Sequence, residues 1–236
     1  MNRGVVDIGN TRIKSAVFNL NGEIIQKTSF ISLEETYDWL SENEVFSLII
    51  SSTSSLLIKV DNRFKTIILN HECKIPFINM YETPHTLGTD RIAIMAAAKY
   101  LYPNENVLVF DIGTCITIDF LNKSGKYFGG NISPGIQLRF KSMHEMTGRL
   151  PLSNIDIKTT SLGNNTLSAL ANGVFYGILN EINGYIDFFT NEHKNIKIVL
   201  TGGDSKYFEV TQKNEIFAHP DWILQGLYYL LKINEK

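Results

Sequence analysis

The sequence predicts an α/β protein of two matching halves, in which each half opens with a β-meander and continues as a mixed sheet flanked by helices. The first observation is an internal repeat, since VVDIGNTRIKSAVF (residues 5–18) resembles VLVFDIGTCITIDF (residues 107–120). The second observation is that helical and extended patterns alternate after each copy. The break at Pro103-Asn104 sets two predicted domains, residues 1–103 and 104–236.

Composition excludes several classes of protein. The 236 residues are 44% hydrophobic and 19% charged with a net charge of −2, so nothing suggests a nucleic-acid or anionic-membrane partner. Cys73 and Cys115 lie far apart and the five histidines are scattered, which favours neither a disulfide framework nor a zinc site. No stretch reaches the roughly 18 apolar residues of a membrane helix, and no signal region precedes the first strand. We therefore expect a cytoplasmic protein.

Each repeat carries an Asp-Ile-Gly turn between two extended runs, the pattern of a β-hairpin. Gly9 and Gly113 would let backbone N–H groups approach phosphate oxygens. The carboxylates of Asp7 and Asp111 would repel a phosphate. Each turn therefore needs a cation such as Mg²⁺ or K⁺ between its carboxylate and the phosphate. One such turn is ordinary hairpin chemistry. Two in matching contexts favour a pair of phosphate sites.

The first half is predicted to begin with a three-stranded meander over residues 4–31, turning at Asn21-Gly22. Lys14 on its second strand either reaches toward phosphates at the Asp7 turn or is an ordinary solvent-facing lysine. The later elements are predicted as a Ser32-capped helix over 32–44, a strand over 45–52, a helix over 54–64, and strands over 65–70 and 74–81.

Residues 81–101, YETPHTLGTDRIAIMAAAKYL, read as a loop followed by a helix from Arg91 onward. Asp90 then stands at the helix N-terminus, where it is either an N-cap or a general base, and the two roles are compatible. The guanidinium of Arg91 could bind an acidic substrate in fork geometry.

The second half repeats the meander, with a turn at Ser124-Gly125 and Gly129-Gly130 closing the third strand. The later elements are predicted as a helix from Ser133-Pro134 to Thr147, a long helix over 166–189, a strand over 195–200 and a helix over 219–233. Between the last strand and the last helix, the Gly-Gly turn at Thr201–Asp204 is suited to lie against a nucleotide base. Gly173 and Gly177 on the long helix permit close packing, either within the core or at a subunit interface.

Five segments resemble, in order and spacing, the motifs of type III pantothenate kinases: DIGNTRIK (7–14), YETPHTLGTDR (81–91), DIGTCITID (111–119), GGNISPG (129–135) and LTGGD (200–204). The resemblance implies two duplicated actin-like (ribonuclease H-like) domains and a homodimer. It also implies ATP-dependent phosphorylation of pantothenate to 4′-phosphopantothenate, the first step of coenzyme A biosynthesis, with Mg²⁺ on the ATP and K⁺ or ammonium as a monovalent cation.

Residue roles follow from the same resemblance. Asp90 is implied as the catalytic base and Asp111 as the cation ligand. The implied ATP-binding residues are Asp7, Ile8, Gly9, Asn10, Thr11, Arg12, Ile13, Lys14, Thr114, Gly202 and Gly203. The implied pantothenate-binding residues are Tyr81, Gly88, Thr89, Asp90, Arg91 and Thr166. Cys115 departs from the alanine common in the family, and we expect ATP binding to survive while the thiol adds sensitivity to oxidation.

Two alternatives stay open from the sequence. One is another small-molecule kinase of the same superfamily, which the loop at residues 88–91 disfavours. The other is a nucleotide-dependent regulatory accessory protein that hydrolyses ATP slowly. Such a protein would not need Asp90 beside Arg91 to activate an acceptor.

Overall fold

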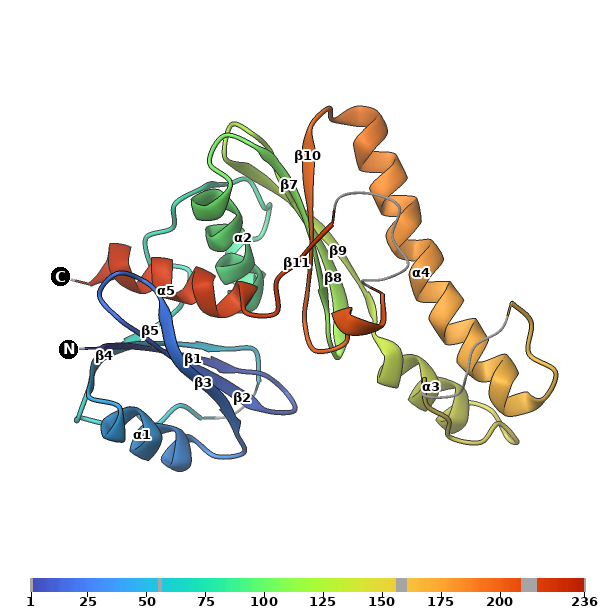
Figure 1. Cartoon of the computed structure of the whole chain (residues 1–236), viewed down its shortest axis with the longest axis horizontal. Helices are drawn as coiled ribbons and strands as arrows, with labels where there is room; N and C mark the ends of the chain where they lie inside the picture. Colours follow the sequence, from blue (N-terminus) through green and yellow to red (C-terminus); the bar gives the residue numbers. More distant parts are fainter. Residues whose placement is uncertain (1, 55–56, 156–160, 209–215, 236) are drawn as a thin grey trace. The chain divides into compact units, whose positions relative to one another are not determined.

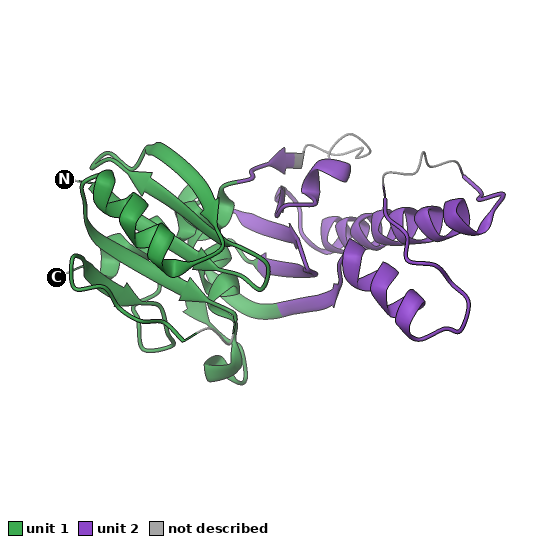
Figure 2. Cartoon of the chain, turned by 90° about the horizontal axis from the view of Figure 1, so that it is seen from below, with its two compact units in different colours: residues 1–104, 121–129, 221–236 green, residues 105–120, 130–220 purple. Residues whose placement is uncertain are grey.

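The computed structural model describes residues 2–54, 57–155, 161–208 and 216–235. The chain forms two compact units (Figure 2): unit 1 holds residues 1–104, 121–129 and 221–236, and unit 2 holds residues 105–120 and 130–220. A unit boundary thus follows Asn104, while two later segments also pack with the first half. The units are defined by contacts within the chain and not by repetition of the fold. The predicted division into duplicated domains 1–103 and 104–236 therefore stays a prediction.

Unit 1 contains a five-stranded sheet of order β3-β2-β1-β4-β5. Its strands are β1 (Asn2–Ile8), β2 (Ile13–Phe18), β3 (Ile24–Phe30), β4 (Val45–Ser52) and β5 (Lys65–Ile68). The first three are antiparallel neighbours, whereas β4 is parallel to both β1 and β5. The meander predicted for residues 4–31 and the strand predicted for 45–52 are therefore confirmed.

Helix α1 (Leu33–Glu42) covers one face of this sheet, and α2 (Thr89–Leu101) and α5 (Trp222–Asn234) cover the other (Figure 1). The predicted cap of α1 is confirmed, because the Ser32 side chain accepts a hydrogen bond from the Glu35 N–H at 3.3 Å. Close packing of α2 on α5 depends on Gly226, where a Cβ would collide with the Ala93 carbonyl oxygen.

The end of α5 is fixed to the sheet through Glu235. Its carboxylate accepts hydrogen bonds from Ser47 Oγ on β4 and from Arg3 Nε on β1, the latter at 2.8 Å. Burial raises the pKa of Glu235, but the hydrogen bonds from Ser47 and Arg3 outweigh burial and lower this pKa overall. The ionised carboxylate therefore stabilises the folded state.

The second sheet has the order β11-β10-β7-β8-β9-β6. Its strands are β6 (Ile78–Asn79), β7 (Asn106–Ile112), β8 (Cys115–Leu121), β9 (Lys126–Pro134), β10 (Ile196–Thr201) and β11 (Ile216–Ala218). Strand β9 begins in unit 1, where it pairs with β6, and ends in unit 2. Strand β10 is parallel to both β7 and β11.

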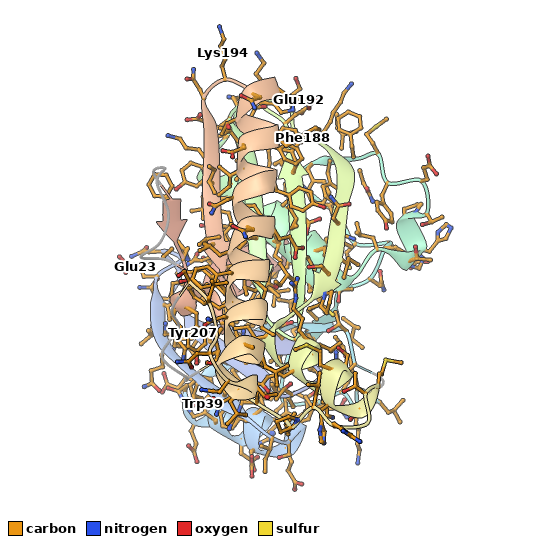
Figure 3. All side chains as sticks on the ribbon, turned by 90° about the vertical axis from the view of Figure 1, so that its right-hand side faces the viewer. Glu23, Trp39, Phe188, Glu192, Lys194 and Tyr207 are labelled. Atoms are coloured by element: carbon orange, nitrogen blue, oxygen red, sulfur yellow. The ribbon has the colours of Figure 1, made fainter. Side chains whose placement is uncertain are left out.

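Helices α3 (Ile136–Glu145) and α4 (Thr166–Glu192) pack in unit 2. The predicted stripe on α4 is confirmed, since Val174, Ile178, Ile182 and Ile186 are all buried in the core. Phe188, which Figure 3 labels, is 55% exposed. Short 3₁₀ turns at Pro84–Thr86 and Ser205–Tyr207 complete the elements. No helix among the described residues is long and apolar enough to cross a membrane.

The helix predicted over 54–64 is wrong for the part that can be judged, since residues 57–64 form no helix and Ser55 and Leu56 lie outside the described residues. Two side-chain bonds favour a loop instead. Tyr37 Oη donates to the Lys59 carbonyl at 3.0 Å, and the Arg63 N–H donates to Asp61 Oδ1 at 2.9 Å. The second bond closes a local turn, and such a turn competes with helix formation.

Two further predictions need correction. The strand expected over 74–81 shortens to β6, residues 78–79. Gly129-Gly130 does not close the third strand of the second meander, because β9 continues to Pro134. As a result Ser133 and Pro134 belong to the strand, and α3 begins at Ile136 with Gly135 as its N-cap.

Candidate active site

The first predicted phosphate turn lies at the carboxyl end of β1. Asp7 is 7% exposed and pairs across the hairpin with Lys14. The Gly9 N–H donates to the Arg12 carbonyl at 3.2 Å and closes the connection between the strands. Residues 10–12 are exposed at its tip. The turn therefore offers accessible backbone beside a buried carboxylate.

The start of α2 is bonded to the same edge of the unit 1 sheet. Ser51 on β4 pairs with Asp7 in the parallel β1-β4 register. Thr89 Oγ1 donates to the Ser52 carbonyl at 3.1 Å and lies 2.9 Å from Ser51 Oγ. Because a hydroxyl carries one proton, Thr89 accepts its second bond from Ser51. These bonds place the N-terminus of α2 at the sheet edge that holds Asp7.

Asp90 lies in the first turn of α2 and is not its N-cap, which corrects one of the two roles expected for it. The N-cap is Gly88, which provides no side-chain cap. Asp90 Oδ1 instead accepts a hydrogen bond from the Arg91 N–H at 2.8 Å. A Cβ on Gly88 would collide with Asp90 Oδ1, so a side chain at this position would displace the Asp90 carboxylate. The Asp90 carboxylate is thus fixed by local backbone.

Arg91 lies among aromatic rings. Its Cζ is 5.7 Å from the Tyr81 ring centroid and 6.0 Å from that of Tyr127, and the residue is only 4% exposed. Nothing in the sequence marks Tyr127 as part of this site, because an aromatic residue in a strand pattern is typical of an ordinary core. Gly129, at φ +121°, makes room for the Tyr81 ring, which approaches within 3.1 Å of where its Cβ would be.

The second predicted phosphate turn lies in unit 2, between β7 and β8. Asp111 is half-buried, while Thr114 and Cys115 are exposed. The Gly113 N–H donates to the Cys115 carbonyl, and the Gly135 N–H at the start of α3 donates to the Thr114 carbonyl, both at 3.0 Å. The Cys115 thiol is free and exposed beside the turn, and its sensitivity to oxidation stays a prediction.

The Gly-Gly turn after β10 lies directly against the Asp111 turn. Thr201 pairs with Asp111 in the parallel register, and the Asp204 N–H donates to the Ile112 carbonyl at 3.0 Å. Gly202 has φ +93°, and a Cβ there would collide with the Ile112 carbonyl. Two segments predicted separately to bind one nucleotide are therefore neighbours in unit 2.

The other predicted site residues of unit 2 are less constrained. Gly203 has no atom within 4 Å of where a Cβ would be. Burial raises the pKa of Asp204, against the opposing charge of Lys206. Thr166 is the exposed first residue of α4, after the N-cap Asn165. It belongs to unit 2, whereas the other predicted pantothenate-binding residues belong to unit 1.

No cluster of three or more His, Cys, Asp or Glu side chains that could hold a metal occurs within the described ranges of the chain. In kinases Mg²⁺ is commonly held by one or two carboxylates together with substrate phosphates. Asp7 and Asp111 each supply one carboxylate beside a glycine turn.

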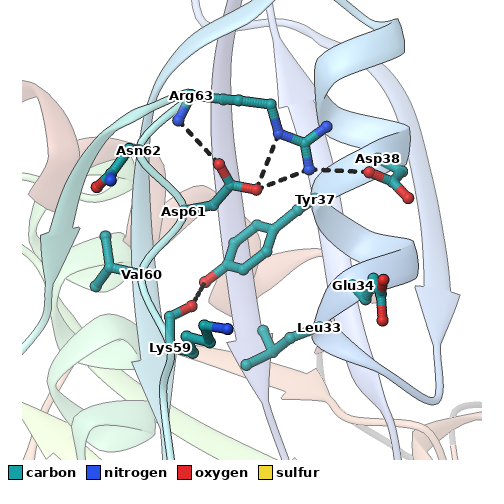
Figure 4. A pocket seen from close by; sticks show the side chains of 9 residues that line it. All are labelled: Leu33, Glu34, Tyr37, Asp38, Lys59, Val60, Asp61, Asn62 and Arg63. Carbon is teal, nitrogen blue, oxygen red and sulfur yellow. Dashed lines mark hydrogen bonds and ion pairs between the residues drawn. The ribbon is translucent and has the colours of Figure 1, made fainter.

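A cavity of about 520 Å³ lies elsewhere on unit 1, between the start of α1 and residues 59–63 (Figure 4). Its charged groups engage one another, since Arg63 Nη2 bonds Asp61 Oδ2 at 2.7 Å and Asp38 Oδ1 at 2.9 Å. None of the predicted site residues lines it.

The family model for type III pantothenate kinase matches residues 5–187. A type III pantothenate kinase of Christiangramia forsetii is 39% identical, with 98% of each chain covered. That of Flavobacterium johnsoniae is 37% identical, with 94% of each chain covered. These matches confirm the resemblance drawn from the five motifs.

Solved structures confirm the predicted α/β fold class. A Campylobacter jejuni protein assigned to the Baf family of transcriptional activators gives a TM-score of 0.66 at 24% identity, covering 97% of each chain. The activator of 2-hydroxyisocaproyl-CoA dehydratase from Clostridium difficile, solved with bound ADPNP, gives 0.55 at 14% identity, covering 100% of this chain and 96% of its own. Because the family model and the curated relatives extend over most of its length, the chain belongs to the type III pantothenate kinase family.

Proposed function

We propose that this protein transfers the γ-phosphoryl group of ATP to the primary hydroxyl of pantothenate, giving 4′-phosphopantothenate and ADP in the first step of coenzyme A biosynthesis. Family membership supports ATP and pantothenate as the substrates and a divalent metal as the partner of ATP. One observation carries the assignment of residues. The hydroxyl of Thr89 bonds both Ser51 and Ser52, so the helix start that bears Asp90 lies at the strand edge that bears Asp7.

The nucleotide contacts are assigned for each unit by itself. In unit 1, residues 7–14 would contact phosphates; in unit 2, Thr114 would contact phosphates and Gly202 with Gly203 would lie against the adenosine. Support comes from the exposed loop tip at residues 10–12 and from the direct contact of the Gly202 turn with the Asp111 turn. A bound divalent metal would supply neutralisation of phosphate charge, and the protein contributes mainly positioning and N–H donors.

The acceptor is assigned to the start of α2. Asp90 would take the proton of the primary hydroxyl as that oxygen bonds to the γ-phosphorus and the bond to ADP breaks. Arg91 would hold the pantothenate carboxylate. Tyr81, Gly88, Thr89 and Thr166 are the remaining proposed contacts with pantothenate.

Four further assignments belong to this proposal. A monovalent cation, K⁺ or ammonium, is placed at Asp111, and the chain is taken as two duplicated actin-like domains. The protein is placed in the cytoplasm, which suits the free thiols of Cys73 and Cys115. It is also taken as a homodimer through the face of α4 that carries Gly173, where no atom lies within 4 Å of an added Cβ. Gly177 is a weaker candidate for this face, because a Cβ there would lie 3.3 Å from Arg139 Nη1 on α3.

Asp90→Asn tests the catalytic assignment. Asparagine keeps an oxygen that can accept the Arg91 N–H but is a far weaker base, so kcat should fall by about 10²- to 10⁴-fold. ATP affinity, measured by calorimetry, should stay within about twofold of wild type, because Asp90 is not assigned to the nucleotide. The matched control is Glu82→Gln, an exposed carboxylate of the same loop, which should retain turnover. Turnover retained by Asp90→Asn would remove Asp90 from the role of base.

A further inference from the structure

We propose that Tyr127 is a positioning residue for the acceptor site, holding the Arg91 guanidinium in the orientation that binds the carboxylate. This inference rests on the proposed function, in which Arg91 binds the acid group of the acceptor. Tyr127 touches no reacting atom. It acts through Arg91 and Tyr81.

The guanidinium of Arg91 lies beside two neighbouring aromatic rings, at a similar distance from each. Its Cζ lies 5.7 Å from the Tyr81 centroid and 6.0 Å from the Tyr127 centroid. Both distances fall within the range of cation–π attraction, which strengthens when the cation is desolvated. Arg91 is 4% exposed, so this condition holds. The two rings lie nearly parallel, with centroids 6.3 Å apart and an interplanar angle of 16°.

The Tyr127 ring is itself firmly held. It is 0% exposed and meets the edge of Phe77, with ring centroids 5.9 Å apart. The Tyr127 carbonyl accepts the Met80 N–H at 2.8 Å, and Asn79 pairs with Tyr127 between β6 and β9. Asn79 Oδ1 in turn accepts the Tyr81 N–H at 3.0 Å. The two-residue strand β6 therefore connects Tyr127 to the segment that presents Tyr81.

Gly129 allows the two rings to lie parallel. Its φ of +121° is unfavourable for residues with a side chain, and Tyr81 Cδ2 would lie 3.1 Å from a Cβ at this position. Tyr127 and Gly129 lie on the same strand, and together they determine the positions of the two aromatic rings beside Arg91.

A guanidinium recognises a carboxylate through two parallel N–H bonds, and this recognition depends on its orientation. Removing the Tyr127 ring should keep the charge of Arg91 but allow its guanidinium to adopt other orientations. The loss should therefore appear as weaker selection of an acidic acceptor, while the nucleotide turns are unaffected.

The test compares pantothenate with pantothenol, its analogue in which an alcohol replaces the carboxylate. The variants are Tyr127→Leu, Tyr127→Phe and Phe77→Leu. Tyr127→Leu should lower kcat/KM for pantothenate about tenfold with little change for pantothenol and for the KM of ATP. Tyr127→Phe keeps the ring and should restore wild-type discrimination. Phe77→Leu trims the same cluster but keeps both rings beside Arg91 and the backbone bonds of Tyr127, so it should reduce thermal stability and change discrimination less than Tyr127→Leu does.

The outcomes separate this inference from the proposed function. If wild type discriminates between the acceptors and Tyr127→Leu discriminates equally well, the positioning role is refuted while the proposed function stands. An equal loss for both acceptors, matched by Phe77→Leu, would also refute it and leave a structural role. Wild-type protein with no pantothenate-dependent turnover would overturn the proposed function, and this inference with it.

Discussion

Thr89→Val should destabilise the fold and reduce catalysis together, because one hydroxyl joins α2 to the carboxyl end of β4. Valine keeps the shape of threonine but removes the donor to the Ser52 carbonyl and the acceptor for Ser51 Oγ, which lie 3.1 and 2.9 Å away. Ser51 is 0% exposed, so water cannot take over its lost bond.

The magnitude follows from these two bonds. A typical hydrogen bond contributes about 0.5–1.5 kcal/mol net, and a buried polar group left unpaired costs about 1–3 kcal/mol. The expected loss in the free energy of unfolding is therefore about 1.5–4.5 kcal/mol. For a chain of this size each kcal/mol shifts Tm by roughly 2–4 °C, which gives a fall of about 3–18 °C. Because Asp90 follows Thr89 directly, kcat/KM should fall by at least about tenfold.

The assay pairs thermal unfolding with steady-state kinetics on the same preparations. Thr86→Val is the matched control, since Thr86 bonds only within its own exposed turn, to the Thr83 carbonyl at 2.9 Å and to Thr83 Oγ1. Thr89→Ser keeps the hydroxyl and should behave nearly as wild type. If Thr89→Val loses no more stability or activity than Thr86→Val, the bond between α2 and β4 does not support the site.

Two further predictions concern other parts of the fold. Gly202→Ala should cost about 1–3 kcal/mol of stability and weaken ATP binding measured by calorimetry, since Gly202 has φ +93° against the Ile112 carbonyl. Gly203→Ala, where no atom lies within 4 Å of the added Cβ, should leave thermal stability unchanged, and an equal loss of stability in the two variants would contradict the reasoning. Glu235→Gln should cost about 1.5–3 kcal/mol at pH 7, because the folded pKa of Glu235 is lowered and the neutral amide loses the ion pair with Arg3. That stability is present above the unfolded pKa near 4.5 and is lost as the pH falls through the folded pKa, so the difference from wild type should narrow as the pH is lowered from 4.5, and a difference that does not change with pH would contradict it.

The sequence predicted well those elements whose signals are local. Alternating strands with an Asn-Gly turn predicted the first meander, and Ser32 before a helical pattern predicted α1 and its cap. The long apolar stripe predicted α4. Each of these signals is contained within a few turns of the chain, so no distant contact was needed to interpret it.

The failures involve contacts between distant segments or competing local bonds. Residues 57–64 carry helix-compatible residues, but Tyr37, about twenty positions earlier, bonds the Lys59 carbonyl and favours a loop. Asp90 fits the N-cap pattern, yet its carboxylate bonds the next residue and Gly88 takes the cap position.

The candidate site shows the same limit. The motifs identified Asp7, Asp90 and Asp111 by their local sequence. The contact of Gly202 with Ile112 depends on the parallel pairing of β10 with β7, which no local pattern specifies. The aromatic surroundings of Arg91 likewise depend on the pairing of β6 with β9.

The central claim, that the acceptor is pantothenate, is tested most directly by ADP release from the purified protein with ATP and Mg²⁺, with and without pantothenate, in K⁺ and then in Na⁺ buffer. We predict release that requires pantothenate and rises in K⁺, the latter through the cation assigned to Asp111. Release that ignores pantothenate would contradict the claim and favour another small-molecule kinase or a slow nucleotide-hydrolysing regulator.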